Sequence, residues 1–172
     1  MNHVMVDIET LGTRPGDCIL SIGAVWFTAD EIKSKFYVTI DSNASREAGF
    51  KAQRSTVEWW EKQNEVARTA AFRGELSPVS AFKQFGMWLP AEPVIWGNGA
   101  NFDNALLSAG YRILALEQPW KFWNDRCYRT IKNLFPDVDF HRVGTYHNAL
   151  DDAESQAQHL LAIVNAKGLT LN

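Results

Sequence analysis

Two acidic side chains stand close together near the start of the chain, in the segment Asp7-Ile8-Glu9. The apolar run from Val4 to Ile8 predicts a buried strand, and because side chains alternate along a strand, Asp7 and Glu9 point to the same face. Two adjacent carboxylates repel each other unless a cation joins them, and Mg²⁺ prefers carboxylate oxygens. The pair indicates a divalent metal site, with two solvated acids at a strand end as the alternative.

Two more acids follow expected secondary structure. Asp103 comes after an apolar strand and a glycine-rich turn, near the start of a helix, where the helix dipole alone would also favour an acid. Asp152 lies in the first turns of the last expected helix and off its apolar stripe, so core packing does not explain it. His147 precedes it in a loop, and an imidazole there could be either structural or a proton acceptor.

Five strands are expected to position these side chains. The first three span Val4–Ile8, Cys18–Thr28 and Lys35–Ile40, and their short connections favour an antiparallel meander. Pro93–Trp96 is a short buried strand stopped by glycines, and Lys121–Trp123 is the expected fifth strand.

Helices are expected between and after the later strands. A capping box at Ser55–Glu58 opens one helix, and Ser77-Pro78 opens another through Leu89. A third is expected from Asn101 to Gly110, where the glycine would end it, and Asn148–Ala166 has the clearest apolar periodicity. Pro136–Tyr146 is expected to be a loop. This order predicts an α/β fold with a mixed five-stranded sheet flanked by helices.

Composition narrows the functional classes. A chain of 172 residues with 46% hydrophobic and 22% charged residues suits one globular domain, expected to span 1–172. Its net charge of −3 means that any phosphodiester must be held by local basic groups or bound cations. Two distant cysteines indicate neither a disulfide framework nor a zinc site. With no signal-like start and no long apolar run, a cytoplasmic location without a membrane partner is expected.

Three segments together carry a family resemblance. They are Asp7-Ile8-Glu9-Thr10-Leu11-Gly12-Thr13, Trp96-Gly97-Asn98-Gly99-Ala100-Asn101-Phe102-Asp103-Asn104 and His147-Asn148-Ala149-Leu150-Asp151-Asp152-Ala153. In type and order they resemble the DEDDh 3′→5′ exonucleases of the ribonuclease-H-like superfamily, over nearly the whole chain. Many members have Asn where this chain has Gly99, with Asn98 and Asn101 on either side.

A closer resemblance is to phage and prophage exonucleases of the exodeoxyribonuclease-VIII-like kind and to related mycobacterial exoribonucleases. It rests on Thr56-Val57-Glu58-Trp59-Trp60, Trp96-Gly97-Asn98-Gly99 and Trp123-Asn124-Asp125-Arg126.

The resemblance implies the roles of the candidate residues. Two Mg²⁺ ions, or Mn²⁺ in their place, would be held by Asp7, Glu9, Asp103 and Asp152, with Asp7 between them. They would activate water and stabilise the leaving 3′-oxygen, while His147 would be the general base that swings in from its loop. The segment Thr10, Leu11 and Gly12 would cradle the terminal nucleotide, with Leu11 on its base.

Adjacent tryptophans add a second candidate contact with substrate. In a helix Trp59 and Trp60 point about 100° apart, so they cannot be equally buried. The more exposed one could stack on a base, although packing alone would also explain the pair. Four basic residues could contact phosphate or be ordinary solvated charges: Arg126, Arg129, Lys132 and Arg142.

The expected activity is removal of nucleoside 5′-monophosphates from the free 3′ end of single-stranded DNA or of 3′ overhangs. An exoribonuclease with the same site is the first alternative, because the catalytic residues do not decide how a 2′-OH is met. A catalytically inactive nucleic-acid-binding module is the second, and the presence of all five expected catalytic residues argues against it. The resemblance also admits a homodimer.

Overall fold

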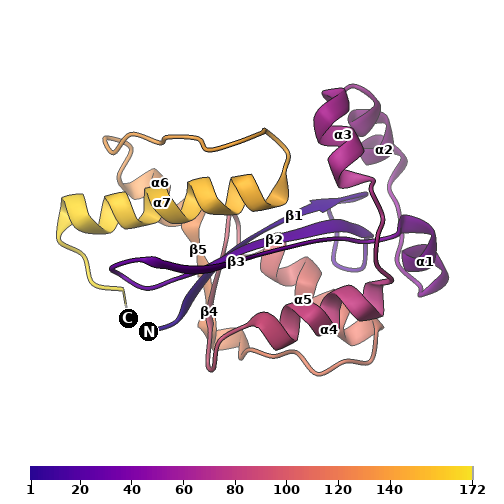
Figure 1. Cartoon of the computed structure of the whole chain (residues 1–172), viewed down its shortest axis with the longest axis horizontal. Helices are drawn as coiled ribbons and strands as arrows, with labels where there is room; N and C mark the ends of the chain where they lie inside the picture. Colours follow the sequence, from indigo (N-terminus) through magenta and orange to yellow (C-terminus); the bar gives the residue numbers. More distant parts are fainter. Residues whose placement is uncertain (172) are drawn as a thin grey trace.

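A mixed five-stranded sheet forms the centre of the computed structural model, which describes residues 1–171. Its strands are β1 (His3–Thr10), β2 (Ile19–Phe27), β3 (Ile32–Thr39), β4 (Val94–Gly97) and β5 (Asp125–Cys127), in the order β3-β2-β1-β4-β5. The first three strands are antiparallel, and β4 and β5 run parallel to β1 (Figure 1). The predicted sheet and its antiparallel meander are therefore confirmed.

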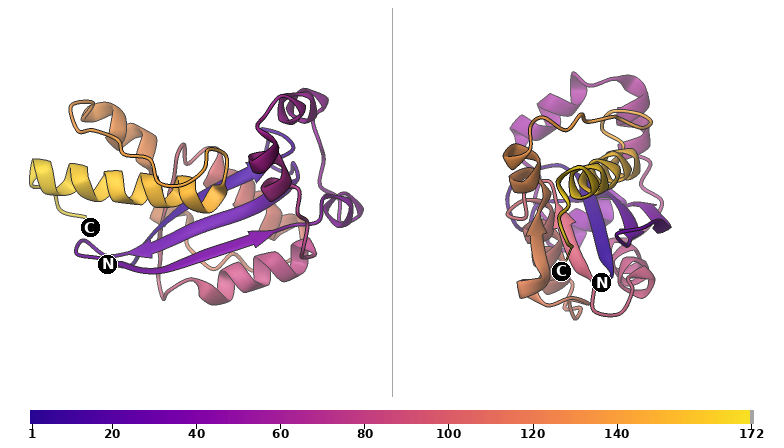
Figure 2. Two further views of the ribbon diagram at one scale, coloured as in Figure 1. Left: turned by 45° about the horizontal axis from the view of Figure 1, so that its top comes forward. Right: turned by 90° about the vertical axis from the view of Figure 1, so that its left-hand side faces the viewer.

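Helices cover both faces and one end of this sheet. They are α1 (Ser42–Glu47), α2 (Arg54–Glu61), α3 (Glu65–Ala71), α4 (Pro78–Trp88), α5 (Asp103–Ile113), α6 (Tyr128–Leu134) and α7 (Ala149–Lys167). Helices α6 and α7 lie on one face and α4 and α5 on the other, while α2 and α3 stand beyond the end of β1 (Figures 1 and 2). None of the helices within residues 1–171 is long and apolar enough to cross a membrane.

Alternation along β1 decides which layer each side chain meets. Val4, Val6 and Ile8 enter the apolar core shared with α4 and α5, whereas Met5 enters the core shared with α7. Asp7 and Glu9 continue the Met5 face, because a strand has a period of two residues. The acidic pair is thereby directed toward the start of α7.

Two helix starts agree with the sequence. Helix α4 has Ser77 as its N-cap and Pro78 in its first turn, and α7 has Asn148 as its N-cap. The Asn148 side chain accepts from the backbone N–H groups of Leu150 and Asp151, which satisfies donors that the helix leaves free. Helix α7 ends at Gly168 in the left-handed conformation.

The position predicted for the fifth strand is wrong. Residues 122–124 form a 3₁₀ turn, and β5 begins one residue later at Asp125. The apolar pair Phe122 and Trp123 that suggested a strand is exposed instead. Side-chain hydrogen bonds hold β5: Asp125 Oδ1 accepts from Asn104 Nδ2 at 2.8 Å and from Trp120 Nε1 at 2.9 Å. A strand without apolar alternation gives no periodic signal.

Two predicted helix boundaries are also wrong. Helix α2 begins at Arg54 after Gln53, and Ser55 does not cap it. Gln53 is fixed by tertiary contact, since its Nε2 donates to Asp17 Oδ2 at 2.6 Å. Gly110 does not end α5, which continues to Ile113; a Cβ there would lie 2.4 Å from the Phe82 ring, so this glycine permits close helix packing.

Candidate active site

A glycine opposite Asp7 allows α7 to approach the acidic pair. Asp7 pairs with Gly23 in the β1–β2 ladder, and a Cβ on Gly23 would lie 2.1 Å from the carbonyl carbon of Ala149. The first turn of α7 therefore rests directly on the sheet. Asp152 in that turn is 8% exposed, and one of its carboxylate oxygens lies within 4.8 Å of a carboxylate oxygen of Glu9 on β1.

A second glycine, Gly97, allows the helix that carries Asp103 to pack closely against the sheet. A Cβ on Gly97 would lie 2.4 Å from Asn104 Oδ1 and 3.0 Å from Asp103 Cβ, so the start of α5 packs against the end of β4. Asn104 Nδ2 also donates to the Ile95 carbonyl at 3.1 Å. Asp103, the first residue of α5, is thus held at 2% exposure.

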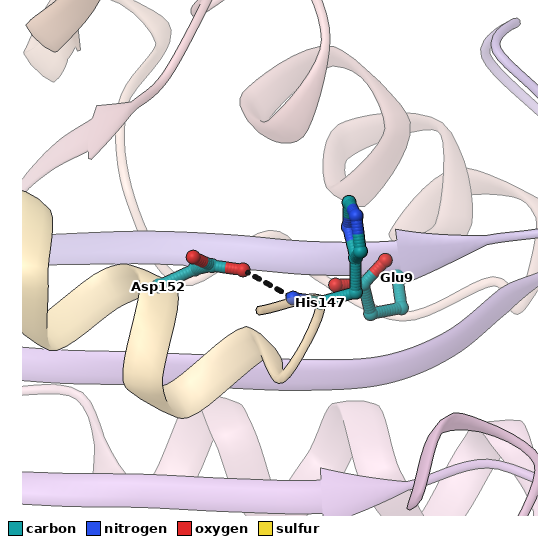
Figure 3. Close-up of side chains that lie close together, drawn as sticks. All are labelled: Glu9, His147 and Asp152. Carbon is teal, nitrogen blue, oxygen red and sulfur yellow. Dashed lines mark hydrogen bonds between the residues drawn. The ribbon is translucent and has the colours of Figure 1, made fainter. Parts of the chain in front are cut away.

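His147 lies beside two of the acids. One ring nitrogen of His147 and one carboxylate oxygen each from Glu9 and Asp152 lie within 4.8 Å of one another. Figure 3 shows the imidazole standing above Glu9, with the His147 backbone N–H donating to Asp152 Oδ2 at 3.1 Å. The ring meets Trp59 edge-on at 5.1 Å between centroids. The imidazole is therefore already at the acids, and no swing is needed to bring it there.

The segment that carries His147 is tied along α7. Residues 135–148 contain no helix or strand, as predicted for Pro136–Tyr146. The contacts that fasten this segment to α7 include Val138 O with His159 Nε2 at 2.9 Å, Val143 N with Ser155 Oγ at 2.9 Å, and Thr145 N with Asp151 Oδ2 at 2.7 Å. Figure 1 shows it running over α7 to the start of that helix.

Burial and mutual repulsion disfavour ionisation of the acids. The pKa of Asp7 is raised well above its ordinary value by burial and then by the charges of Asp103, Glu9 and Asp152. Burial, with Asp152 and Asp103, raises the pKa of Glu9 to about 8. Burial raises the pKa of Asp103 to about 7, although backbone N–H groups and Arg129 act in the opposite direction. A bound cation would relieve this repulsion.

The donors present fit hard divalent cations. Four carboxylates converge, and carboxylate oxygen is what Mg²⁺ and Mn²⁺ prefer. Asp103 Oδ2 is buried and has no hydrogen-bond partner among the described residues, which is costly for a carboxylate unless a cation meets it. Asp7, Glu9, Asp103 and Asp152 could therefore hold the metal.

Two hollows meet at Glu9. One, of about 290 Å³, is lined by Asp7, Glu9, His147 and Asp152. The other, of about 390 Å³, is lined by Glu9, Thr10, Trp59 and Phe102. The acids thus open into an adjoining cleft whose walls carry aromatic side chains.

Of the two adjacent tryptophans, Trp60 is buried and Trp59 is exposed to a ligand. Trp60 is 1% exposed, and its Nε1 donates to the Thr10 carbonyl at 2.8 Å, so its role is structural. Trp59 is 40% exposed and lines the cleft. The expectation that the pair differs in burial is confirmed, and only Trp59 presents a ring to a ligand.

The segment Thr10 to Gly12 makes most of its contacts within the protein itself. Leu11 is 6% exposed and packs in an apolar cluster with Leu20 and Trp60, so little of its side chain faces solvent. Its contact with the terminal base stays a prediction. Its backbone N–H donates to Cys18 O at 2.8 Å. Gly12 is needed for packing, since a Cβ there would lie 2.2 Å from Asp17 Oδ2.

Two site residues are absent from the sequence-based set. Gln156 Nε2 donates to Asp7 Oδ1 at 2.9 Å, and Phe102 lines the cleft beside Trp59. Gln156 lies four residues after Asp152 on the same face of α7, so helical spacing could have identified it. Phe102 gave no signal beyond its place before Asp103.

The four basic residues divide between the site and the surface. Arg142 and Lys132 line the acidic hollow, and Arg142 pairs with Asp152. Arg129 lies beside Gly99 and donates to the Asn98 carbonyl. Arg126 donates to backbone carbonyls at Trp123 and Asp125.

A family model described as "3'-5' exoribonuclease Rv2179c-like domain" matches residues 2–164. No curated protein sequence matches the chain.

Solved structures of similar fold include the nuclease domain of 3'hExo, described as a DEDDh family member bound to rAMP. It has a TM-score of 0.64 and 13% identity, over 99% of this chain and 96% of that one. Exonuclease X in complex with 5′ overhanging duplex DNA has a TM-score of 0.61 and 16% identity, over 98% and 94%. A full-length 3′-exonuclease has a TM-score of 0.58 and 13% identity, over 99% and 84%. None of these matches is described as a phage or prophage enzyme, so that part of the closer resemblance is not supported, whereas the resemblance to exoribonucleases agrees with the family model.

Proposed function

Because the chain belongs to the family of Rv2179c-like 3′-5′ exoribonuclease domains, we propose that it removes nucleotides one at a time from the 3′ end of RNA, using divalent cations. The observation that carries this proposal is that Glu9, Asp152 and His147 offer ligand atoms within 4.8 Å of one another, beside Asp7 in the same hollow. Asp103 is near enough for its charge to raise the pKa of Asp7 and Glu9. Burial raises the pKa of three of these acids, and repulsion by the other acids adds to the effect at Asp7 and Glu9, as expected of a site built for cations.

The chain's own groups divide the work. The four carboxylates hold the cations, and Gln156 fixes the orientation of Asp7 through its 2.9 Å hydrogen bond. His147 takes the proton of the attacking water, and Trp59 keeps that imidazole in place by edge contact. When bound, the cations would make water more acidic and stabilise negative charge on the leaving 3′-oxygen.

The adjoining cleft suits a terminal nucleotide. Trp59 and Phe102 give it aromatic walls on which a base can stack, and such stacking contributes roughly 1–3 kcal/mol per base. Glu9 belongs to both hollows, so a nucleotide in the cleft would bring its phosphodiester to the acids. Helix α2 forms one wall of this cleft through Ser55, Thr56 and Trp59, which suits the end of a chain.

RNA is the preferred substrate because the matched family is described as exoribonucleases. The sequence-based preference for DNA stands as the second candidate, supported by the fold likeness to Exonuclease X, which was seen with duplex DNA. The 2′-OH distinguishes the two polymers, so the comparison needs substrates that differ in the sugar alone.

The test is degradation of 5′-labelled RNA and DNA of identical sequence with Mg²⁺ or Mn²⁺. We expect a ladder shortening by single nucleotides from the first time point, 5′-mononucleotide products and faster loss of RNA. A 3′-phosphate or a circular substrate should resist.

The matched control is Asp103→Asn, which keeps the shape of the side chain and removes a carboxylate. It should abolish activity in the same preparation. Cutting of circles, or full activity in excess chelator, would overturn the proposed exonuclease; binding without cleavage by the wild type would favour the inactive binding module. Faster loss of DNA would restore the DNA preference and leave the chemistry unchanged.

A further inference from the structure

The acidic hollow contains a cation of the protein's own. The Arg142 guanidinium, from the segment before α7, pairs with Asp152 Oδ1. Both side chains are largely buried, at 22% and 11% exposure. Partial burial makes such a pair stronger than an ion pair in open water.

This contact conflicts with the role proposed for Asp152. The Oδ2 atom accepts from the His147 backbone N–H at 3.1 Å and Oδ1 accepts from Arg142, so each oxygen of Asp152 already has one partner. A cation that binds Oδ1 must share that oxygen with the guanidinium or displace it, and a cation that binds Oδ2 would lie close to the guanidinium. Like charges so close would repel, which favours displacement.

The surroundings leave Arg142 able to move while its backbone stays fixed. Its guanidinium carbon lies 3.7 Å from the centroid of the Tyr146 ring, which is itself 65% exposed. The neighbouring backbone is held by the Val143–Ser155 hydrogen bond. Arg142 Nε is buried and has no hydrogen-bond partner among the described residues, so the guanidinium is not fully satisfied by its present contacts.

We propose that Arg142 is a displaceable counter-cation: it pairs with Asp152 in the metal-free protein, yields Asp152 to the metal, and then contacts a phosphate of the substrate. This inference rests on the proposed function, since it takes Asp152 as a metal ligand. A guanidinium is a planar donor that matches phosphate oxygens, and the released group would remain in the hollow where the phosphodiester meets the acids. Metal binding and substrate binding would thereby be coupled through one side chain.

The first measurement is titration calorimetry with Mn²⁺ at one fixed pH. If Arg142 competes with the metal, Arg142→Gln should tighten metal binding roughly three- to tenfold, the range set by the strength of a partly exposed ion pair. Melting should agree: the rise in Tm caused by Mn²⁺ should be larger in the variant than in the wild type.

The matched control is Lys132→Gln. Lys132 lines the same hollow and carries the same charge, but its ammonium lies over the Phe140 ring, 5.6 Å from the centroid. Loss of any nearby positive charge slightly favours a cation, so we expect less than a twofold effect. An equal gain in Mn²⁺ affinity in both variants would show a general electrostatic effect of nearby positive charge. That result would overturn the specific role of Arg142.

The second measurement is binding of a labelled oligonucleotide with Mn²⁺ in a His147→Ala background, where cleavage is suppressed. Adding Arg142→Gln should weaken this binding by roughly three- to tenfold, as expected for one lost phosphate contact. Tighter metal binding together with weaker oligonucleotide binding is the signature of the proposal. Unchanged or weaker metal binding, or unchanged oligonucleotide binding, would overturn it.

Should Arg142→Gln fail to fold, Tyr146→Leu removes the exposed ring against which Arg142 rests. It should tighten Mn²⁺ binding in the same direction, by a smaller factor, and no change there would count against the proposal. The two hypotheses can fail separately. A wild type that binds no Mn²⁺ contradicts the proposed function itself, whereas normal binding by the wild type with no effect of these variants contradicts only the role of Arg142.

Discussion

The surroundings of individual carboxylates at this site disfavour their ionised forms. Asp7, Glu9 and Asp103 have raised pKa values because they are buried, and at Asp7 and Glu9 the charges of the neighbouring acids raise the pKa further. A folded protein without metal must therefore either hold protons on these groups or tolerate their repulsion. Residues selected for folding alone would be paired or exposed.

The raised pKa of Glu9 makes metal-free stability depend on pH. Its folded value of about 8 exceeds the ordinary 4.5, so between these limits the folded protein binds more protons than the unfolded chain. Stability should therefore be greatest below the lower limit and fall as pH rises toward about 8. Urea unfolding in excess chelator across this range measures it. Glu9→Gln should flatten the profile, and a stability that rises with pH would contradict the shift.

Substitution of His147 and substitution of Asp152 should have different effects on metal binding and turnover. Asp152→Ala deletes a proposed ligand, so it should weaken Mn²⁺ binding as well as turnover, with partial recovery at high Mn²⁺. His147→Ala deletes only the proposed proton acceptor, so turnover should fall by about 10²–10⁴-fold while Mn²⁺ affinity barely changes. Calorimetry and single-turnover rates on both variants separate the roles. Near-normal turnover in His147→Ala at neutral pH would make His147 a structural residue.

At the scale of elements, the start of α7 is the part that assembles the site. It contributes Asp152 and Gln156, and it carries the segment with His147. Its position depends on Gly23, because any side chain there would meet the backbone at Ala149. The active site is thus sensitive to residues that touch neither metal nor substrate.

Gly23→Ala tests this dependence. A Cβ 2.1 Å from the Ala149 carbonyl carbon would force α7 away from β2, at a cost of roughly 1–3 kcal/mol typical of overpacking. Activity should fall far more than that loss of stability explains, because Asp152 would move from Asp7. Urea unfolding and a degradation assay measure the two effects.

Gly168→Ala is the control for that variant. It lies at the other end of α7 with φ of 61° and nothing within 4 Å of a new Cβ. Its left-handed backbone should cost roughly 1 kcal/mol of stability. Turnover should stay near normal, and an equal loss of activity in both variants would remove the specific role of Gly23.

At the scale of the whole molecule, charge limits how the substrate is held. The net charge of −3 gives no general attraction for a polyanion, so binding must come from a few basic side chains, the metal and the aromatic cleft. Such an enzyme should bind the end of a nucleic-acid strand and make few contacts along the rest of it. A homodimer remains a prediction, for which light scattering is the direct measurement.

Salt dependence is the corresponding measurement. If Arg129, Lys132 and Arg142 are the only phosphate contacts, the logarithm of oligonucleotide affinity should fall with the logarithm of salt concentration at a slope of about −2, since a single strand gives about −0.7 per phosphate. Fluorescence anisotropy with Mn²⁺ held constant gives the slope. A slope much steeper than this would show an extended basic surface that the site does not explain.

Local patterns were enough to predict much of this protein. Alternation placed Asp7 and Glu9 on one face of a strand, helical periodicity located α7, and the capping pair Ser77-Pro78 marked the start of α4. These features depend on neighbours in the chain. The family resemblance then supplied the five candidate catalytic residues, which local pattern alone left ambiguous with solvated acids.

Tertiary contacts decided the rest. The short strand β5 is held by side-chain hydrogen bonds of Asp125, and Gly110 lies within α5 because Phe82 packs against it. Burial separated Trp59 from Trp60, and enclosed Leu11. The Arg142–Asp152 pair and the Gln156–Asp7 hydrogen bond arise only when α7 lies across β1. Contacts between residues far apart in the chain leave no period in the sequence, so composition and spacing could not reveal them.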